Sequence, residues 1–96
     1  MDNVYVVLTR TDTMFDDRFK DVSAIFKSYK DALAYLQKKY EEYSEKAKRY
    51  NKEYKCDDWQ CYFDDGVVRS YGDKDDVTIK IVSVKFGDEI DVWNLI

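Results

Sequence analysis

The fold of this 96-residue chain is decided by residues 28–55, which read SYKDALAYLQKKYEEYSEKAKRYNKEYK. Tyrosine and aliphatic side chains recur there at alternating steps of four and three residues, at Tyr29, Leu33, Leu36, Tyr40, Tyr43, Ala47, Tyr50 and Tyr54. Because these steps average about 3.5 residues, the side chains share one stripe of an α-helix. The stretch therefore predicts a single helix of about 26 residues, which is about 39 Å long.

The same stretch predicts where the helix begins and which part of it is buried. Ser28 precedes the first turn and Asp31 follows three residues later, which is the form of a capping box. No glycine or proline interrupts the pattern before Lys55. Residues 32–36 are apolar on nearly every side, which predicts close burial on a sheet, whereas the other faces become charged after Lys38.

The segments on either side of the helix predict a β-sheet. Val4–Thr9 is a nearly continuous apolar and β-branched run, typical of a central strand buried on both faces. Asp65-Gly66 separates two alternating runs and predicts a tight hairpin. A change of phase near Ile81–Val82 predicts a β-bulge. The other predicted elements are a loop or a short helical turn over Thr11–Lys20 and strands over Val22–Phe26, Trp59–Phe63, Val67–Tyr71, Val77–Phe86 and Glu89–Leu95.

These elements predict one α+β domain over residues 1–96, in the order β-β-α-β-β-β-β. We expect an antiparallel or mixed sheet of about five to six strands with the helix across one face. Since a strand of six or seven residues spans only about 20–23 Å, the helix should overhang the sheet. Its first half, Tyr29–Tyr40, would then be core. The overhang would leave Tyr43, Ala47, Tyr50 and Tyr54 to contact the Thr11–Lys20 loop, a second copy of the chain or a protein partner.

The composition argues against a catalytic or metal site. The chain has no histidine, which is the commonest general base and metal ligand. Cys56 and Cys61 have a spacing that fits neither a standard zinc site nor a redox motif. We expect a non-enzymatic protein without cofactor or metal and with free thiols, a disulfide between the two being the alternative. Neither a signal peptide nor a membrane-spanning apolar run is visible, which predicts a cytoplasmic protein with no membrane contact.

Charge is distributed unevenly over a chain whose net charge is −4. Residues 29–55 hold eight bases and five acids, whereas residues 56–96 hold ten acids and four bases. The basic helix with its interleaved tyrosines suggests weak binding of single-stranded nucleic acid. Because glutamates are mixed into the helix and the chain is acidic, a solvated charged face is the better interpretation. We therefore expect no nucleic-acid partner.

The carboxylates of the C-terminal third lie at predicted turns and at the helix end, as Asp57, Asp58, Asp64, Asp65, Asp73, Asp75 and Asp76. Aspartate is favoured in turns for local reasons, and such acids also keep a small domain soluble. If the hairpins align, the same carboxylates crowd along one or both rims of the sheet. An acidic rim of this kind could imitate a phosphate backbone and occupy a basic cleft. No calcium-binding hand is expected, because its glycine and terminal glutamate are missing.

In size, acidity, aromatic richness and lack of a catalytic motif, the chain resembles small phage- and mobile-element-encoded inhibitors of host defence, such as anti-CRISPR proteins. The resemblance transfers no residue roles. It implies a binding mechanism, in which the protein acts in the host cytoplasm and blocks a nucleic-acid-binding protein such as a CRISPR effector. The first hypothesis is therefore an acidic inhibitor. The alternative is a homo-oligomer, such as a homodimer, with a structural or scaffold role, joined through the distal tyrosines.

Overall fold

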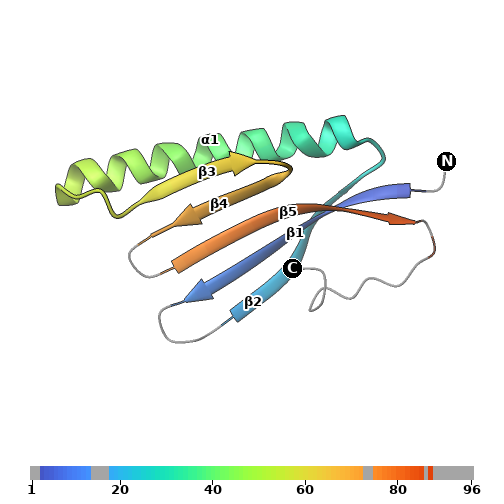
Figure 1. Cartoon of the computed structure of the whole chain (residues 1–96), viewed down its shortest axis with the longest axis horizontal. Coiled ribbons are helices and arrows are strands. Elements are labelled where there is room, and N and C mark those ends of the chain that lie inside the picture. The colour runs from blue at the N-terminus through green and yellow to red at the C-terminus, as the bar shows by residue number, and fades with distance from the viewer. Residues whose placement is uncertain (1–2, 14–17, 73–74, 86, 88–96) are drawn as a thin grey trace.

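The computed structural model describes residues 3–13, 18–72, 75–85 and 87 (Figure 1). The elements in chain order are β1 (Asn3–Thr13), β2 (Arg18–Phe26), α1 (Tyr29–Tyr54), β3 (Gln60–Asp64), β4 (Val67–Tyr71) and β5 (Asp75–Lys85). Within these residues the chain is α+β, with a five-stranded antiparallel sheet and one helix packed across it, so the predicted fold class is confirmed. The strand predicted over Glu89–Leu95 lies outside the described residues.

The strands follow the order β2-β1-β5-β4-β3, and each neighbouring pair is antiparallel. β1 lies between β2 and β5, so the inner strand predicted over Val4–Thr9 is confirmed. Val6, Val7 and Leu8 are completely buried, and they alternate between the two faces of the sheet. A run of consecutive apolar residues is what a strand covered on both faces requires.

The bulge predicted near Ile81–Val82 is wrong, because the pairing of β5 with β1 is regular along its whole length. Ile81 packs with the core on the helix side, and Val82 packs with the core on the opposite side. Two consecutive apolar residues are therefore accommodated without a change of register, since both faces of the sheet are apolar at this point. A register shift occurs instead between Val7 and Leu8, where β1 pairs with β2.

The loop predicted over Thr11–Lys20 is wrong at both ends. Its first three residues continue β1 and its last three begin β2, while residues 14–17 lie outside the described part of the chain. The Asp12 carboxylate joins the two strands by accepting hydrogen bonds from Arg18 Nε (2.7 Å) and Arg10 Nε (2.9 Å). These bonds, that from Arg18 first, hold the pKa of Asp12 below its usual range. A polar segment thus extends a strand because Asp12 is paired with Arg18 of the neighbouring strand.

The helix begins and ends where the sequence predicts. Ser28 is extended, and its Oγ accepts a hydrogen bond from the Asp31 backbone N–H (3.4 Å). Lys55 follows the last turn in the left-handed conformation, with a φ of 52°, and the Cys56 N–H donates to the Asn51 carbonyl (3.0 Å). Both ends therefore satisfy backbone groups that lack a partner within the helix.

The predicted hairpin turn at Asp65-Gly66 is also confirmed. Both residues have a positive φ, of 50° and 73°, as a type I′ turn requires. A Cβ added at Gly66 would stand only 3.1 Å from the Tyr29 hydroxyl oxygen. The turn between β3 and β4 is therefore packed against the first tyrosine of α1.

The core on the helix side is built around the first half of α1. Ala32 and Leu36 are completely buried and pack with Val7, Val68 and Ile79 of three strands. Around this cluster lie three aromatic pairs with ring centres 5.6, 5.6 and 5.9 Å apart, namely Tyr5–Tyr29, Phe26–Tyr35 and Tyr40–Phe63. The first half of the helix therefore contributes the core expected of it at Ala32 and Leu36, whereas Tyr29 is 45% exposed and Ala34 is exposed, so the close burial predicted for residues 32–36 holds on one side only.

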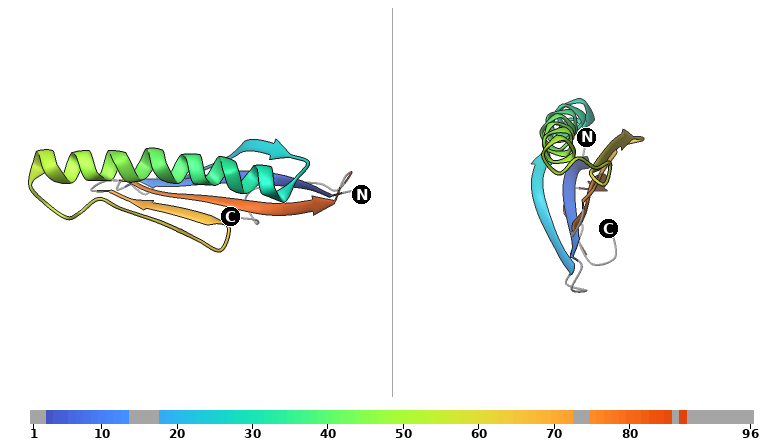
Figure 2. Two further views of the ribbon diagram at one scale, coloured as in Figure 1. Left: turned by 90° about the horizontal axis from the view of Figure 1, so that it is seen from above. Right: turned by 90° about the vertical axis from the view of Figure 1, so that its left-hand side faces the viewer.

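The helix and the inner strands diverge. In Figure 1, β5, β1 and β2 slope away from α1 toward its C-terminal end, whereas β3 stays beside it, and Figure 2 shows α1 along one face of the sheet. The short strands from which the sequence predicts an overhang are not found at β1 and β5. β1 and β5 have 11 residues each, or about 36 Å, which is close to the length of the helix. It is their direction that separates them from the second half of α1.

Candidate binding groove

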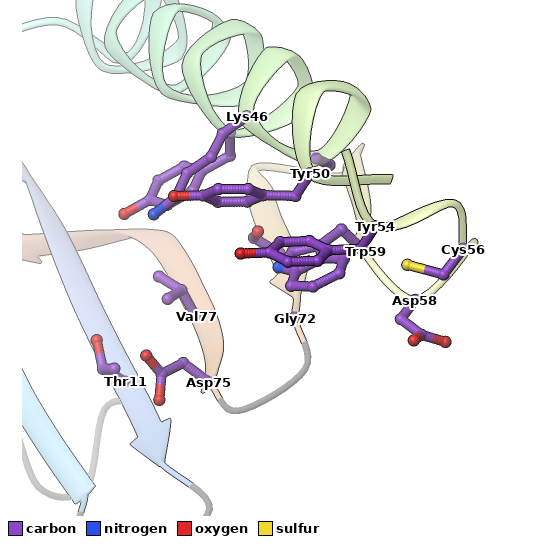
Figure 3. Close-up of a pocket in the computed structure, with 13 residues that line it drawn as sticks. Thr11, Lys46, Tyr50, Tyr54, Cys56, Asp58, Trp59, Gly72, Asp75 and Val77 are labelled. Atoms are coloured by element: carbon purple, nitrogen blue, oxygen red, sulfur yellow. The ribbon is translucent and has the colours of Figure 1, made fainter. Parts of the chain in front are cut away.

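An open groove of about 790 Å³ lies where the second half of α1 separates from the inner strands (Figure 3). The helix forms one wall, the segment between α1 and β3 forms another, and the ends of β1, β4 and β5 form the floor. The lining residues are Tyr43, Lys46, Ala47, Tyr50 and Tyr54 of the helix, Cys56, Asp58 and Trp59 of the connecting segment, and Thr11, Ser70, Gly72, Asp75 and Val77 of the floor. Tyr43, Ala47, Tyr50 and Tyr54 therefore line one surface. The expectation that the overhang leaves all four uncovered is wrong for two of them, because Ala47 is only 7% exposed and Tyr43 packs against the core.

Three aromatic rings form the back of the groove. Trp59 stacks on Tyr54, with ring centres 5.6 Å apart and planes at 21°. Tyr50 lies 5.4 Å from Trp59 and 6.3 Å from Tyr54. Tyr54 is 61% exposed, and in Figure 3 the hydroxyl groups of both tyrosines point toward the opening above the strands. The cluster thus presents apolar ring surface and polar tips together.

Trp59 is held in place from two sides. The Asn51 side chain donates from Nδ2 to the Trp59 carbonyl (2.7 Å) and accepts at Oδ1 from the Trp59 backbone N–H (3.0 Å). Gly72 lies against the indole, because a Cβ there would stand 3.1 Å from Trp59 Nε1. One amide side chain therefore closes the connecting segment back onto the helix, and one glycine leaves room for the ring.

The inner end of the groove is continuous with the core. Tyr43 is half-buried there, and burial raises the pKa of its hydroxyl. Burial also raises the pKa of the Cys61 thiol, whose Sγ lies 3.9 Å from the Tyr40 carbonyl oxygen. Cys56 lies on the groove wall with its Sγ 3.7 Å from Asn51 Oδ1. Both cysteines are free thiols, so the expectation of unpaired cysteines is confirmed.

Charges of both signs surround the aromatic cluster. Lys46 Nζ and Arg49 Cζ stand 5.7 and 5.4 Å from the centre of the Tyr50 ring, close enough for cation–π attraction. Asp58 and Asp75 line the groove and are exposed. Figure 3 shows these two residues on opposite sides of the rings, with Asp58 on the connecting segment and Asp75 on β5.

The carboxylates of the predicted acidic rim are divided between two ends of the molecule. Four of them lie at the groove end, where the helix finishes and β5 begins, namely Asp57, Asp58, Asp75 and Asp76. Asp64 and Asp65 lie at the turn between β3 and β4, at the opposite end of that hairpin. Asp73 lies outside the described residues. The sequence leaves open whether these acids lie along one rim of the sheet or along both. The described carboxylates lie along both rims.

Sequence reasoning misses two residues that shape the groove. Trp59 alternates with Cys61 and Phe63 and is therefore placed in a strand, but it lies just before β3 with its ring against the last turns of α1. The signal that could have placed Trp59 is the sharp end of the helix. A strand that turns back directly after a helix brings its first aromatic residue under the last turns of that helix. Asn51 has a weaker signal, since asparagine in a helix often serves a side-chain hydrogen bond.

No protein-family model, curated protein or solved structure matches this chain. In the part of the chain that the structure describes, no group of three His, Cys, Asp or Glu side chains is arranged to hold a metal ion. No helix among these residues combines the length and the apolar character that crossing a membrane requires. Function is therefore inferred from the groove itself.

Proposed function

We propose that this protein is a non-enzymatic binding protein whose groove receives an arginine-bearing basic segment of a protein partner. The observation that carries the proposal is the position of Asp58 and Asp75 on either side of the Tyr54–Trp59 stack. A guanidinium group bonds carboxylates through its N–H groups and stacks on aromatic rings through its plane. In the proposed complex, one arginine of the partner stacks on an exposed ring face and bonds one of these two carboxylates.

The size and the side chains of the groove support a peptide ligand. Its volume of about 790 Å³ lies within the range of roughly 300–1,000 Å³ that is usual for ligand sites. Tyrosine and tryptophan are the commonest anchors of protein interfaces, because they supply rigid apolar area with a polar tip. Tyr54 is the ring that a partner would bury most.

The charges around the groove favour a basic ligand. Lys46 and Arg49 lie over Tyr50, whereas Tyr54 and Trp59 stack at the side where Asp58 lies. The end as a whole carries charges of both signs, with exposed acids at positions 57 and 76 and exposed bases at positions 52 and 55, so the proposal depends on the two acids that line the groove. Because such charges are screened by salt, we expect binding to weaken as ionic strength rises.

Inhibition is the proposed consequence of groove binding. Proteins that bind nucleic acids expose lysine and arginine to the phosphates. A protein that occupies such a segment excludes the nucleic acid. This mechanism is the one implied by the resemblance to inhibitors of host defence, and it needs no catalytic group on this chain.

An arginine-rich peptide tests the proposal. The probe is a short peptide of alternating arginine and glycine, and the readout is the fluorescence of Trp59 in a Trp93→Phe background, which leaves Trp59 as the single tryptophan. We expect a saturable change in fluorescence that salt weakens. The Asp58→Asn/Asp75→Asn variant should lose about fivefold in affinity, since each exposed pair contributes up to about 1 kcal/mol.

The matched control removes the same charges from the other end of the molecule. The Asp64→Asn/Asp65→Asn variant is expected to bind the peptide as the parent does, and asparagine tolerates the left-handed conformation at position 65. Equal losses of peptide affinity in both double variants would show that only net charge matters. If the peptide does not change the fluorescence of Trp59 at low salt, the groove is not the binding site. Capture from a host lysate with the parent and the groove variant would then identify the partner whose nucleic-acid binding is to be assayed.

A further inference from the structure

A row of side chains crosses the whole sheet. Arg69 pairs with Tyr62 on one side and with Thr78 on the other, Thr78 pairs with Arg10, and Arg10 pairs with Lys20. Paired residues of antiparallel strands project to the same face. These five residues, here called the cation row, therefore share one face over about 19 Å, which is four strand spacings of about 4.8 Å.

The neighbouring row identifies the face. Val77 pairs with Ser70 on one side and with Thr11 on the other, and all three line the groove beneath α1. Cys61, which pairs with Ser70, continues their row, and its Sγ lies near the Tyr40 carbonyl. Successive residues of a strand point to opposite faces. The cation row therefore lies on the face that α1 does not cover (Figure 2).

The cation row is positive in a chain whose net charge is −4. It holds three cations and no carboxylate. Arg10 shares the Asp12 carboxylate with Arg18, so two guanidinium groups meet one negative charge. The other carboxylates that the register places on this face, Asp64 and Asp76, stand in the flanking rows. The flanking rows hold both signs, because Lys80 shares the row of Asp64 and Arg18 shares the row of Asp76, so the positive charge is concentrated in the cation row.

Two exposed tyrosines stand at the β3–β4 end of the cation row. Tyr62 is 51% exposed and Tyr71 is 37% exposed, with ring centres 6.0 Å apart and planes at 64°. The Tyr62 hydroxyl is hydrogen-bonded to the Gln60 side-chain oxygen. Single-stranded nucleic acids are bound by sheet faces of this kind, because unpaired bases stack on aromatic rings while cations contact the phosphates.

We infer that the cation row and its two tyrosines bind a short single strand of nucleic acid. Phosphates contact Arg69 and Arg10, and bases stack on Tyr62 and Tyr71. An acidic peptide would use the cations alone and leave the rings exposed. This site is independent of the proposed function, because it lies on the other face of the sheet and attracts the opposite charge. The sequence predicts no such site, since only the register of five strands brings these residues together.

Fluorescence anisotropy of a fluorescein-labelled oligothymidine of about ten nucleotides tests the inference over a range of salt concentrations. Arg69→Ala should weaken binding about threefold to tenfold and lower the salt slope by about 0.7, which corresponds to one phosphate contact on a single strand. The Tyr62→Ala/Tyr71→Ala variant should weaken binding at least about fivefold and leave the slope unchanged, because stacking releases no counterions.

Two helix variants serve as controls, Lys38→Ala for charge and Tyr54→Ala for an aromatic ring, and both should bind the oligonucleotide as the parent does. Circular dichroism confirms that each variant is folded. The inference is overturned if the oligonucleotide does not bind at low salt, or if the controls lose as much affinity as the sheet variants. It is also overturned if a duplex binds as tightly as the single strand, or if polyglutamate displaces the strand at equal charge, since the face would then recognise charge alone.

Discussion

The two halves of α1 continue one apolar stripe, with leucine and tyrosine in the first half and alanine and tyrosine in the second, and they have different surroundings. In the first half, Leu36 is completely buried between strands on the helix side of the sheet. In the second half, Tyr54 is mostly exposed at the edge of a groove. The difference arises in the sheet, because the inner strands diverge from the helix. A periodic stripe therefore predicts which face of a helix is apolar, and not what covers that face.

Truncating one residue from each half gives the largest expected difference. Leu36→Ala should lower the free energy of unfolding by about 3 kcal/mol, because it removes a buried side chain and leaves a cavity. Tyr54→Ala should lower it by less than about 1 kcal/mol, because the ring is mostly exposed. Urea unfolding followed by circular dichroism measures both. Similar losses would mean that the second half is packed as firmly as the first.

Asn51 is expected to matter next, since it determines the shape of the groove. Asn51→Ala removes two hydrogen bonds to Trp59 and should lower the free energy of unfolding by about 1–3 kcal/mol. The emission of Trp59 should also shift to longer wavelength in a Trp93→Phe background as the ring becomes hydrated. Asn51→Asp keeps the acceptor for the Trp59 N–H and should have a smaller effect. A spectrum that does not change would show that the aromatic cluster holds itself together.

The helix cap tests the first half without touching its core. Ser28→Ala removes the hydrogen bond from the Asp31 amide to the Ser28 hydroxyl, and it should lower the free energy of unfolding by about 1 kcal/mol. Ser44→Ala makes the same change within the helix, where alanine is the better helix former, and should not destabilise the protein. Thermal unfolding of the two variants compares them directly. Equal melting temperatures would contradict a functional cap at Ser28.

Low pH should destabilise the protein by a small amount through Asp12, which joins β1 and β2 beneath the second half of the helix. The hydrogen bond from Arg18, and then that from Arg10, lowers the pKa of Asp12 in the folded state. The stabilisation is therefore fully present above the ordinary carboxyl pKa of about 3.9 and is lost as pH falls through the lowered value. Asp12→Asn should flatten the dependence of unfolding on pH below about 4, as measured by urea unfolding at several pH values. If the free energy of unfolding depends on pH in the same way in the parent and in the variant, these hydrogen bonds do not favour the folded state.

Local signals account for most of the fold that the sequence predicts. The Ser28 cap, the helix to Tyr54 and the Asp65-Gly66 turn each depend on residues close together in the chain, and each is confirmed. The extension of β1 to Thr13 and the regular register at Ile81–Val82 depend on partners far away in sequence, and the predictions fail there. Short-range patterns contain no information about which distant strand will satisfy a polar or apolar face.

The candidate site divides in the same way. The prediction that Tyr50 and Tyr54 need a surface beyond the core follows from the helix alone. The residues on the facing walls of the groove cannot be predicted from the helix alone. Trp59 is held there by its hydrogen bond to Asn51, and Asp75 belongs to β5. The cation row is still further from sequence reasoning, since it takes one residue from each of five strands.

The position of β1 in the sheet has a consequence for how the protein folds. Its partner β5 is the last described strand, and the pairs Asn3–Lys85 and Thr13–Asp75 join residues 82 and 62 positions apart. Closing such long loops is entropically unfavourable and slows folding. During synthesis on the ribosome, β1 emerges first and cannot form its inner pairing until β5 has followed. β1, which holds the completely buried residues Val6, Val7 and Leu8, can therefore pair with β2 early but lacks its second partner until nearly all of the described chain has been made.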